Sequence, residues 1–190
     1  MEVSTGIELG VIRLLGLGNE ILADDAFGIL AAQEVARRFP GQIEVVQSSA
    51  AGYDLMDYLL GASRLLVVDT IVTGRAKPGT VSVFTADRVQ PAPGGSPHFL
   101  GLFEVLAVGR KLDLDVPKET IVIAVEASDC TTVGGPIHPD VQSAIPEVVE
   151  LVGRFLHTVL AGAGVMLASS LPWPGPCSLV HGFLRRARCR

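Results

Sequence analysis

Two aspartates and one histidine, far apart in the chain, have the side chains that a divalent metal site needs. Asp25 closes the acidic pair in the stretch GLGNEILADDAFG, Asp69 directly follows an apolar run, and His98 lies in SPHFLGLFEVL. Two carboxylates and one imidazole suit a borderline cation such as nickel or zinc and leave coordination positions open. These residue types therefore allow a catalytic metal site, provided that the fold brings them together.

Each of these residues also has an ordinary structural use. Asp24 is placed to cap the helix that follows, because its carboxylate can accept hydrogen bonds from amides of the first turn. Asp25 would then lie inside that turn, where the helix dipole favours the ionised carboxylate and leaves it available as a ligand. Asp69 can equally be a cap or a turn-forming residue, and His98 taken alone is a surface histidine. The residues by themselves leave both readings open.

The glycine-rich turn before the acidic pair raises a different possibility, a dinucleotide-binding site. That fingerprint needs a third glycine where this chain has Ile21, and an acid at the end of the second strand where it has Gln47. Both requirements fail, which disfavours a nucleotide-binding oxidoreductase. Gly16, Gly18 and Asn19 are expected instead to allow a sharp turn from strand to helix, because these residue types tolerate positive φ.

Hydrophobic periodicity predicts an alternation of strands and helices that would position these residues. Strands are expected at residues 11–17, 43–46, 65–68, 80–85 and 120–125. Helices are expected at residues 26–39, 53–60, 99–111 and 140–160, with a kink at Pro146 in the last. The proline- and glycine-rich residues 89–97 are expected to form an exposed loop.

This alternation indicates an α/β fold, a three-layer αβα sandwich around a mostly parallel twisted sheet of about five strands. The strand at residues 80–85 is expected at an edge and antiparallel. Asp69, at the end of an apolar strand, would lie above the sheet, where open α/β sheets bind ligands at the switch in strand order. His98 opens toward the same edge if its helix packs on the sheet.

Composition limits the class of protein. With 190 residues and 48% hydrophobic side chains, the chain is long enough for one domain, expected at residues 1–164, with a flexible tail at 165–190. A formal net charge of −5 argues against a nucleic-acid-binding surface. Three scattered cysteines suggest neither a disulfide framework nor a thiolate zinc site. We expect a cytoplasmic protein without membrane insertion, because no apolar stretch free of charge is long enough to span a bilayer.

At these motifs the sequence resembles the hydrogenase maturation endopeptidases, which trim the C-terminal extension from the large subunit of nickel–iron hydrogenases. The resemblance runs from about residue 11 to 160. It includes the glycine–asparagine turn with its acidic pair, the stretch VVDTIVTGRAKPGT around Asp69, and SPHFLGLFEVL around His98. Three ordered motifs at family-like separations are more specific than any one of them.

The resemblance implies that Asp25, Asp69 and His98 are the metal-binding and catalytic residues. It also implies that cleavage follows nickel insertion into the large-subunit precursor, and that the protease uses that nickel to recognise its substrate. Zinc or cadmium could substitute for nickel in a crystal. A monomer is expected.

This chain departs from the family pattern at two places. The second acid of the pair is often glutamate followed by glycine in the family, whereas here it is Asp25 followed by Ala26. The shorter carboxylate would reshape the site slightly without removing a ligand. Family members commonly have a Gly-Ile-Glu-like end to the last strand, where this chain has Ala124-Val125-Glu126, so the resemblance makes Glu126 a weak candidate for the substrate site.

Other residues are weaker candidates for chemistry. Ser48, Ser49 and Cys130 have no evident partner base, which disfavours a covalent nucleophile and favours metal-assisted hydrolysis. The three remaining histidines are poorer ligand candidates: His138, His157 and His181. The alternative from another class is a nickel-binding chaperone or recognition module that uses the same three ligands and cuts nothing.

Overall fold

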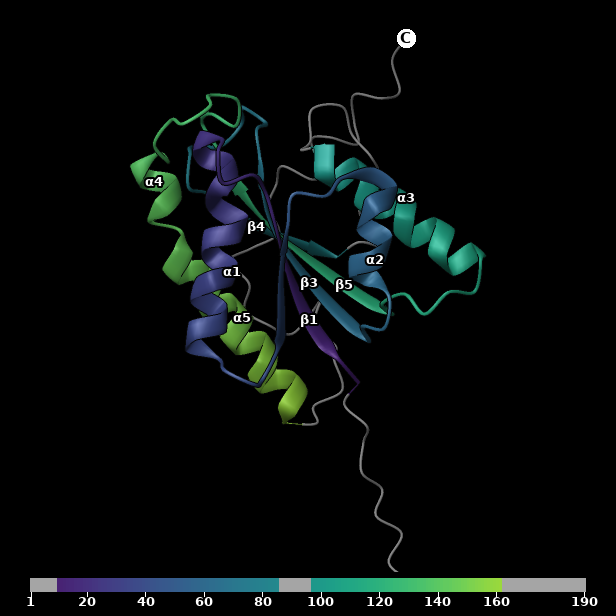
Figure 1. Cartoon of the computed structure of the whole chain (residues 1–190). Coiled ribbons are helices and arrows are strands. Elements are labelled where there is room, and N and C mark those ends of the chain that lie inside the picture. Colours follow the sequence, from purple (N-terminus) through teal and green to yellow (C-terminus); the bar gives the residue numbers. More distant parts are fainter. Residues whose placement is uncertain (1–9, 86–96, 162–190) are drawn as a thin grey trace, which may run out of the picture.

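A five-stranded sheet forms the centre of the computed structural model, which describes residues 10–85 and 97–161, with the side chains of 97–100 excepted (Figure 1). Its order is β2-β1-β3-β5-β4. The strands are β1 (Ile12–Leu17), β2 (Glu44–Ser48), β3 (Arg64–Ile71), β4 (Val81–Thr85) and β5 (Glu119–Glu126). β1, β2, β3 and β5 run parallel, whereas β4 pairs antiparallel with β5 at the edge. The predicted α/β fold and its antiparallel edge strand are therefore confirmed.

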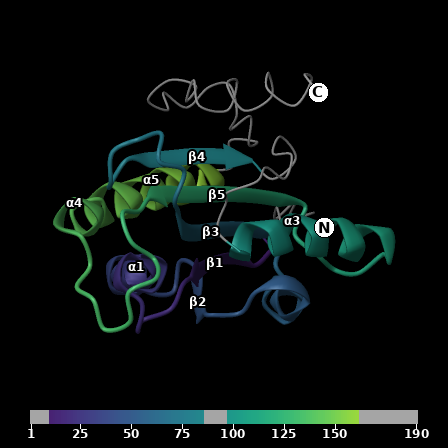
Figure 2. The same ribbon diagram turned by 90° about the horizontal axis from the view of Figure 1, so that it is seen from above.

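Helices cover both faces of the sheet and complete the three predicted layers (Figure 2). One face carries α1 (Phe27–Arg38), α4 (Pro139–Gln142) and α5 (Ile145–Leu160). The other carries the 3₁₀ helix η2 (Gly52–Leu55), α2 (Met56–Leu59) and α3 (Pro97–Lys111). Each face has its own apolar core, because successive strand residues point to opposite sides: Leu14 packs with α1 and α5, and Leu15 with α2 and α3.

The third strand is longer than the sequence indicated. β3 does not stop at Asp69 but continues to Ile71, in register with β5 as far as Glu126. The prediction that Asp69 follows the strand was therefore wrong. A charged residue is a usual sign of a strand end, but here the ladder to β5 holds Asp69 inside the sheet.

The helix expected at residues 140–160 is in fact two helices. α4 ends at Gln142, and α5 begins at Ile145 with Pro146 in its first turn. Proline has no amide hydrogen to donate, so it fits the first turn of a new helix, where the amides have no partner within the helix. Pro146 thus starts α5 rather than kinking one long helix.

Glycines let α1 approach the sheet closely. A Cβ on Gly28, in the first turn of α1, would lie 2.0 Å from the carbonyl oxygen of Leu17 and 2.6 Å from that of Val68. Gly18 has a φ of +149°, and a Cβ there would lie 1.9 Å from the carbonyl oxygen of Asp25. The glycines therefore serve turn geometry and helix packing, and Asn19 does not adopt the positive φ that the sequence suggested.

Two expectations fall on segments outside the described residues: most of the loop at 89–97 and the tail at 165–190. Pro97, expected to end that loop, instead opens α3. No helix within the described part of the chain is long and apolar enough to cross a membrane.

Candidate functional site

The candidate residues gather at the carboxyl edge of the parallel strands, which is uppermost in Figure 1. From β1 the chain adds β2 on one side and then places β3 on the other, so the strand order switches between β1 and β3. Ligands of open α/β sheets bind in the crevice at such a switch. Asp25 follows β1 and Asp69 lies near the end of β3, so both border this switch point.

Asp25 lies in the 3₁₀ helix η1 (Ala23–Ala26), directly before α1. Its side chain is nearly buried. The hydroxyl of Thr70 donates to its Oδ1 over a long separation of 3.4 Å. Asp25 thus sits at the entry to a helix, as expected, with its carboxylate turned toward β3.

Asp69 is fully buried and lies one residue before Thr70 in β3. Its Oδ1 accepts a 2.7 Å hydrogen bond from the Thr70 amide. Thr70 therefore contacts both candidate ligands, Asp69 through its backbone and Asp25 through its hydroxyl. No motif marks Thr70 in the sequence, because threonine is a common strand residue.

His98 is the second residue of α3, and its side chain is outside what the structure describes. The backbone of α3 nevertheless places it. A Cβ on Gly101 would lie 2.6 Å from the Cα of Gly52, at the start of η2 just beyond the carboxyl end of β2. The first turns of α3 therefore lie at the same edge of the sheet as Asp25 and Asp69 (Figure 1).

Asp24 does not cap α1, contrary to the prediction. Its buried carboxylate accepts three backbone hydrogen bonds from the segment after β5: from Ser128 at 2.7 Å, from Asp129 at 2.9 Å and from His138 at 2.6 Å. Neither η1 nor α1 has a side-chain cap. A buried carboxylate needs such donors to compensate for lost hydration, and here they come from residues more than 100 positions away.

Glu126, the weak substrate-site candidate, is also buried and fully engaged. Its Oε1 accepts hydrogen bonds from the amides of Thr73 and Gly74, each at 2.8 Å, and its Oε2 accepts one from the Thr73 hydroxyl at 2.7 Å. The carboxylate thereby holds the start of the connection between β3 and β4 onto the end of β5. This geometry indicates a loop anchor.

Cys130 lies beside the same group of carboxylates. Its Sγ is 3.5 Å from the Thr70 hydroxyl. Either atom could be the donor in this hydrogen bond. Burial, and secondarily the nearby charges of Asp25, Asp24 and Asp69, raise the pKa of Cys130 to about 11. A protonated thiol is a poor nucleophile, which agrees with the expectation that Cys130 does not attack the substrate.

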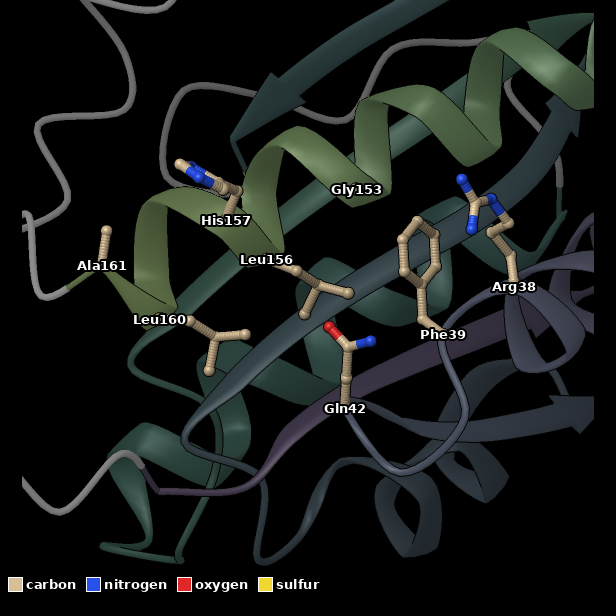
Figure 3. A pocket seen from close by; sticks show the side chains of 8 residues that line it. All are labelled: Arg38, Phe39, Gln42, Gly153, Leu156, His157, Leu160 and Ala161. Carbon is tan, nitrogen blue, oxygen red and sulfur yellow. The ribbon is translucent and has the colours of Figure 1, made fainter.

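No three histidine, cysteine or acidic side chains form a ready metal site within the described residues, which do not include the His98 side chain. The Nδ1 of His138 accepts a hydrogen bond from the Asp140 amide at 3.2 Å and caps α4. His157 lies at the opposite edge of the sheet, where the ends of α1 and α5 line a hollow of about 470 Å³ (Figure 3). The backbone of His138 thus lies beside Asp24 while its imidazole caps α4, and His157 lies away from the candidate site.

Comparison with known proteins gives one consistent result. A sequence model described as "Hydrogenase maturation protease" matches residues 29–154. The chain is 32% identical over 150 residues to hydrogenase expression/formation protein HupD of Bradyrhizobium diazoefficiens, covering 76% of this chain and 77% of that protein. It is 29% identical to hydrogenase 2 maturation protease of Escherichia coli, covering 74% and 87%.

Solved structures agree with the sequence matches. The hydrogenase maturating endopeptidase HybD from E. coli superposes with a TM-score of 0.65 at 27% identity, covering 77% of this chain and 92% of that one. The [NiFe] hydrogenase maturation protease HybD from Thermococcus kodakarensis has a TM-score of 0.61 at 22% identity, which supports the fold. Each of these two relatives and two solved structures aligns with about three quarters of this chain.

Proposed function

Because this chain belongs to the hydrogenase maturation protease family, we propose that it removes the C-terminal extension of a nickel–iron hydrogenase large-subunit precursor after nickel insertion. The family supplies the class of reaction, hydrolysis of a peptide bond by an endopeptidase. One observation supports the finer proposal: Asp25 and Asp69 border the switch point of the sheet, and α3 begins at the same edge with His98 in its first turn.

The proposed ligands of the substrate's nickel are Asp25, Asp69 and His98. Two carboxylate oxygens and one imidazole nitrogen fit a borderline divalent ion, and the buried position of Asp69 would keep competing water away. A metal held there would act as a Lewis acid, polarising the scissile carbonyl or activating water.

The remaining residues of the site orient these ligands. Thr70 joins the two aspartates, through its amide to Asp69 and its hydroxyl to Asp25. Asp24 fixes the backbone on the other side of Asp25 to the segment after β5. Such supporting hydrogen bonds hold metal ligands in one orientation, and their loss commonly weakens metal affinity or activity.

The direct test is to incubate the purified chain with nickel-loaded and nickel-free large-subunit precursor and to follow the precursor mass. We expect truncation of the nickel-loaded form only. Binding of the loaded precursor without any truncation by folded protein would instead identify a recognition module. Truncation of both forms at equal rates would refute the use of nickel.

Substitution of the proposed ligands tests the site. Asp25→Asn, Asp69→Asn and His98→Ala are each expected to reduce the cleavage rate by at least about a thousandfold, because each removes a group that would hold the metal. Asp57→Asn, at an exposed position on α2, is the control and should cleave at the wild-type rate. A triple variant that still cleaves would contradict the metal hypothesis.

A further inference from the structure

Exposed apolar side chains surround the candidate site. Ile21, Tyr53, Val72 and Val133 follow β1, β2, β3 and β5 respectively, so each parallel strand is succeeded by one of them at the carboxyl edge. The other large apolar side chains that are exposed in the described residues lie toward the opposite edge: Val11, Leu112, Leu114 and Leu160. A single exposed apolar residue needs no explanation, but a set gathered around one site marks an interaction surface.

Two members of the set are neighbours in space. Leu22 and Val133 form an isolated antiparallel bridge, and the Gly134 amide donates to the Ile21 carbonyl at 2.7 Å. Ile21 and Val133 therefore lie on adjacent backbone segments. Their exposed fractions are 61% and 73%. We call this pair the apolar shelf.

The backbone under the apolar shelf is firmly held. Besides the bridge, the Ala23 amide donates to Thr132 at 3.1 Å and the Asp24 amide donates to Asp129 at 2.9 Å. The buried Asp24 carboxylate adds three charge-assisted hydrogen bonds to the same segment. A surface fixed before binding loses little conformational entropy when a partner docks, which favours affinity.

The apolar shelf also lies close in the fold to the proposed metal ligands. Ile21 and Asp25 belong to one short connection between β1 and α1, so the shelf and Asp25 lie on the same backbone segment. Across the site, Tyr53 lies in η2, against which the first turns of α3 pack, and α3 begins with the segment that contains His98. The proposed ligands thus lie between two apolar groups.

We propose that the apolar shelf formed by Ile21 and Val133 docks the precursor polypeptide, receiving an aliphatic or aromatic side chain close to the scissile bond. This inference rests on the proposed function and names how its substrate is held. The two connections that build the shelf contain the acidic residues Glu20, Asp24, Asp25 and Asp129 but no lysine or arginine. This charge pattern favours a neutral or basic polypeptide over an anionic membrane or nucleic acid.

The test compares variants in the same cleavage assay with nickel-loaded precursor. The double variant Ile21→Asn/Val133→Asn is expected to raise KM about tenfold to a hundredfold with little change in kcat, because only docking is lost. Leu112→Asn is the matched control, since Leu112 is 62% exposed at the opposite edge, and should keep the wild-type KM. The milder pair Ile21→Thr/Val133→Thr, which retains β-branched shape, covers the case in which the asparagine variant fails to fold.

Different failures identify different errors. If the wild-type chain does not cut loaded precursor, the proposed function fails first. If it cuts, and folded shelf variants cut with the wild-type KM, the docking inference is wrong. Sedimentation of wild-type and variant chains completes the test: loss of self-association without a change in KM would assign the shelf to contact with a second copy and would overturn the proposal.

Discussion

The neighbouring aspartates of the acidic pair have different environments. Asp24 is buried and surrounded by three backbone amides, whereas Asp25 is turned toward the Thr70 hydroxyl beside the candidate metal site. Their backbone positions differ by one residue in a 3₁₀ turn, which points successive side chains in different directions. Asp24 therefore holds structure, and Asp25 is the member of the pair that faces the candidate site.

Asp24→Asn should destabilise the fold. The amide side chain keeps one acceptor oxygen but turns an NH₂ group toward backbone donors, so at least one buried amide is left without a partner. We expect the free energy of unfolding to fall by about 2–4 kcal/mol, measured by urea denaturation at neutral pH. Asp57→Asn, an exposed change of the same chemical kind, should shift it by no more than about 0.5 kcal/mol. Equal effects of the two substitutions would show that Asp24 is not an anchor.

Cys130 should react with iodoacetamide only at high pH in the metal-free protein. Its pKa is raised from 9.0 to about 11, so the reactive thiolate is scarce at pH 8. The alkylation rate in a Cys177→Ser/Cys189→Ser background should rise with a midpoint near pH 11. In urea the midpoint should return to about 9. A folded-state midpoint near 9 would contradict the buried, hydrogen-bonded environment.

The same shift has a consequence for stability. The folded protein binds the thiol proton more tightly than the unfolded chain, so this contribution to stability is complete below about pH 9. It is lost as pH rises from about 9 to about 11. Replacing Cys130 by serine should remove this component of the alkaline loss of stability, which urea denaturation at several pH values would detect.

For individual residues, the sequence predicted their places in the fold better than their hydrogen-bond partners. Asp25 and Asp69 do lie at the same edge of the sheet, because the order of strands and helices already places them there. The capping role of Asp24 was wrong because a cap is inferred from adjacent residues, while its real partners are more than 100 positions away. Thr70 gave no signal, since its importance arises only when β1 and β3 are paired.

The close approach of α1 to the sheet depends on Gly28, which has no side chain. The first turn of α1 lies against the ends of β1 and β3, and Gly28 makes that approach possible. The acidic pair immediately precedes this turn, so the distance between helix and sheet also sets where Asp25 lies. Close packing at Gly28 is thus linked to the geometry of the site.

Gly28→Ala should therefore be harmful. The added methyl would lie 2.0 Å from one backbone carbonyl oxygen and 2.6 Å from another, and neither can rotate away as a side chain would. We expect α1 to shift, with a loss of about 3 kcal/mol in the free energy of unfolding and a lower cleavage rate. Gly135→Ala is the control, because its nearest neighbour is a Thr132 methyl at 3.0 Å, and should cost less than about 1 kcal/mol. Thermal or urea unfolding of both variants measures the difference.

The kinds of elements were predictable, and their ends were less so. The continuous apolar runs at β1, β3 and β5 clearly indicated buried strands. The alternation of apolar and polar residues in β4 correctly indicated an edge strand. The end of β3 was missed because pairing with β5 outweighs the local preference of Asp69 for a turn. The break before α5 was missed because the apolar stripe continues across it from Val141 to Val148.

Across the whole molecule, residues distant in sequence share one sheet and two cores. β1 pairs with β2 and β3, and β3 pairs with β5, so no cut through the described chain separates independent sheets. α1 and α5, near opposite ends of the described residues, pack in one core. This interleaving favours the prediction of a single domain.

Unfolding should accordingly be one cooperative transition. Far-UV circular dichroism and amide hydrogen exchange in β1 and β5 are expected to give the same free energy of unfolding, because neither strand can leave the sheet without exposing both cores. A plateau in the denaturation curve, or exchange of β5 amides through a separate low-energy opening, would indicate two units instead.

The attachment of the segment after β5 to the connection after β1 bears on any attempt to redirect specificity by exchanging loops among relatives. Grafting residues 127–138 alone would place foreign amides against the Asp24 carboxylate, and grafting residues 18–26 alone would place a foreign carboxylate against the host amides. Residues 18–26 and 127–138 should therefore be exchanged together. Chimaeras designed with that pair as one cassette should keep their fold while their preference for a precursor changes, whereas chimaeras that split it should express poorly.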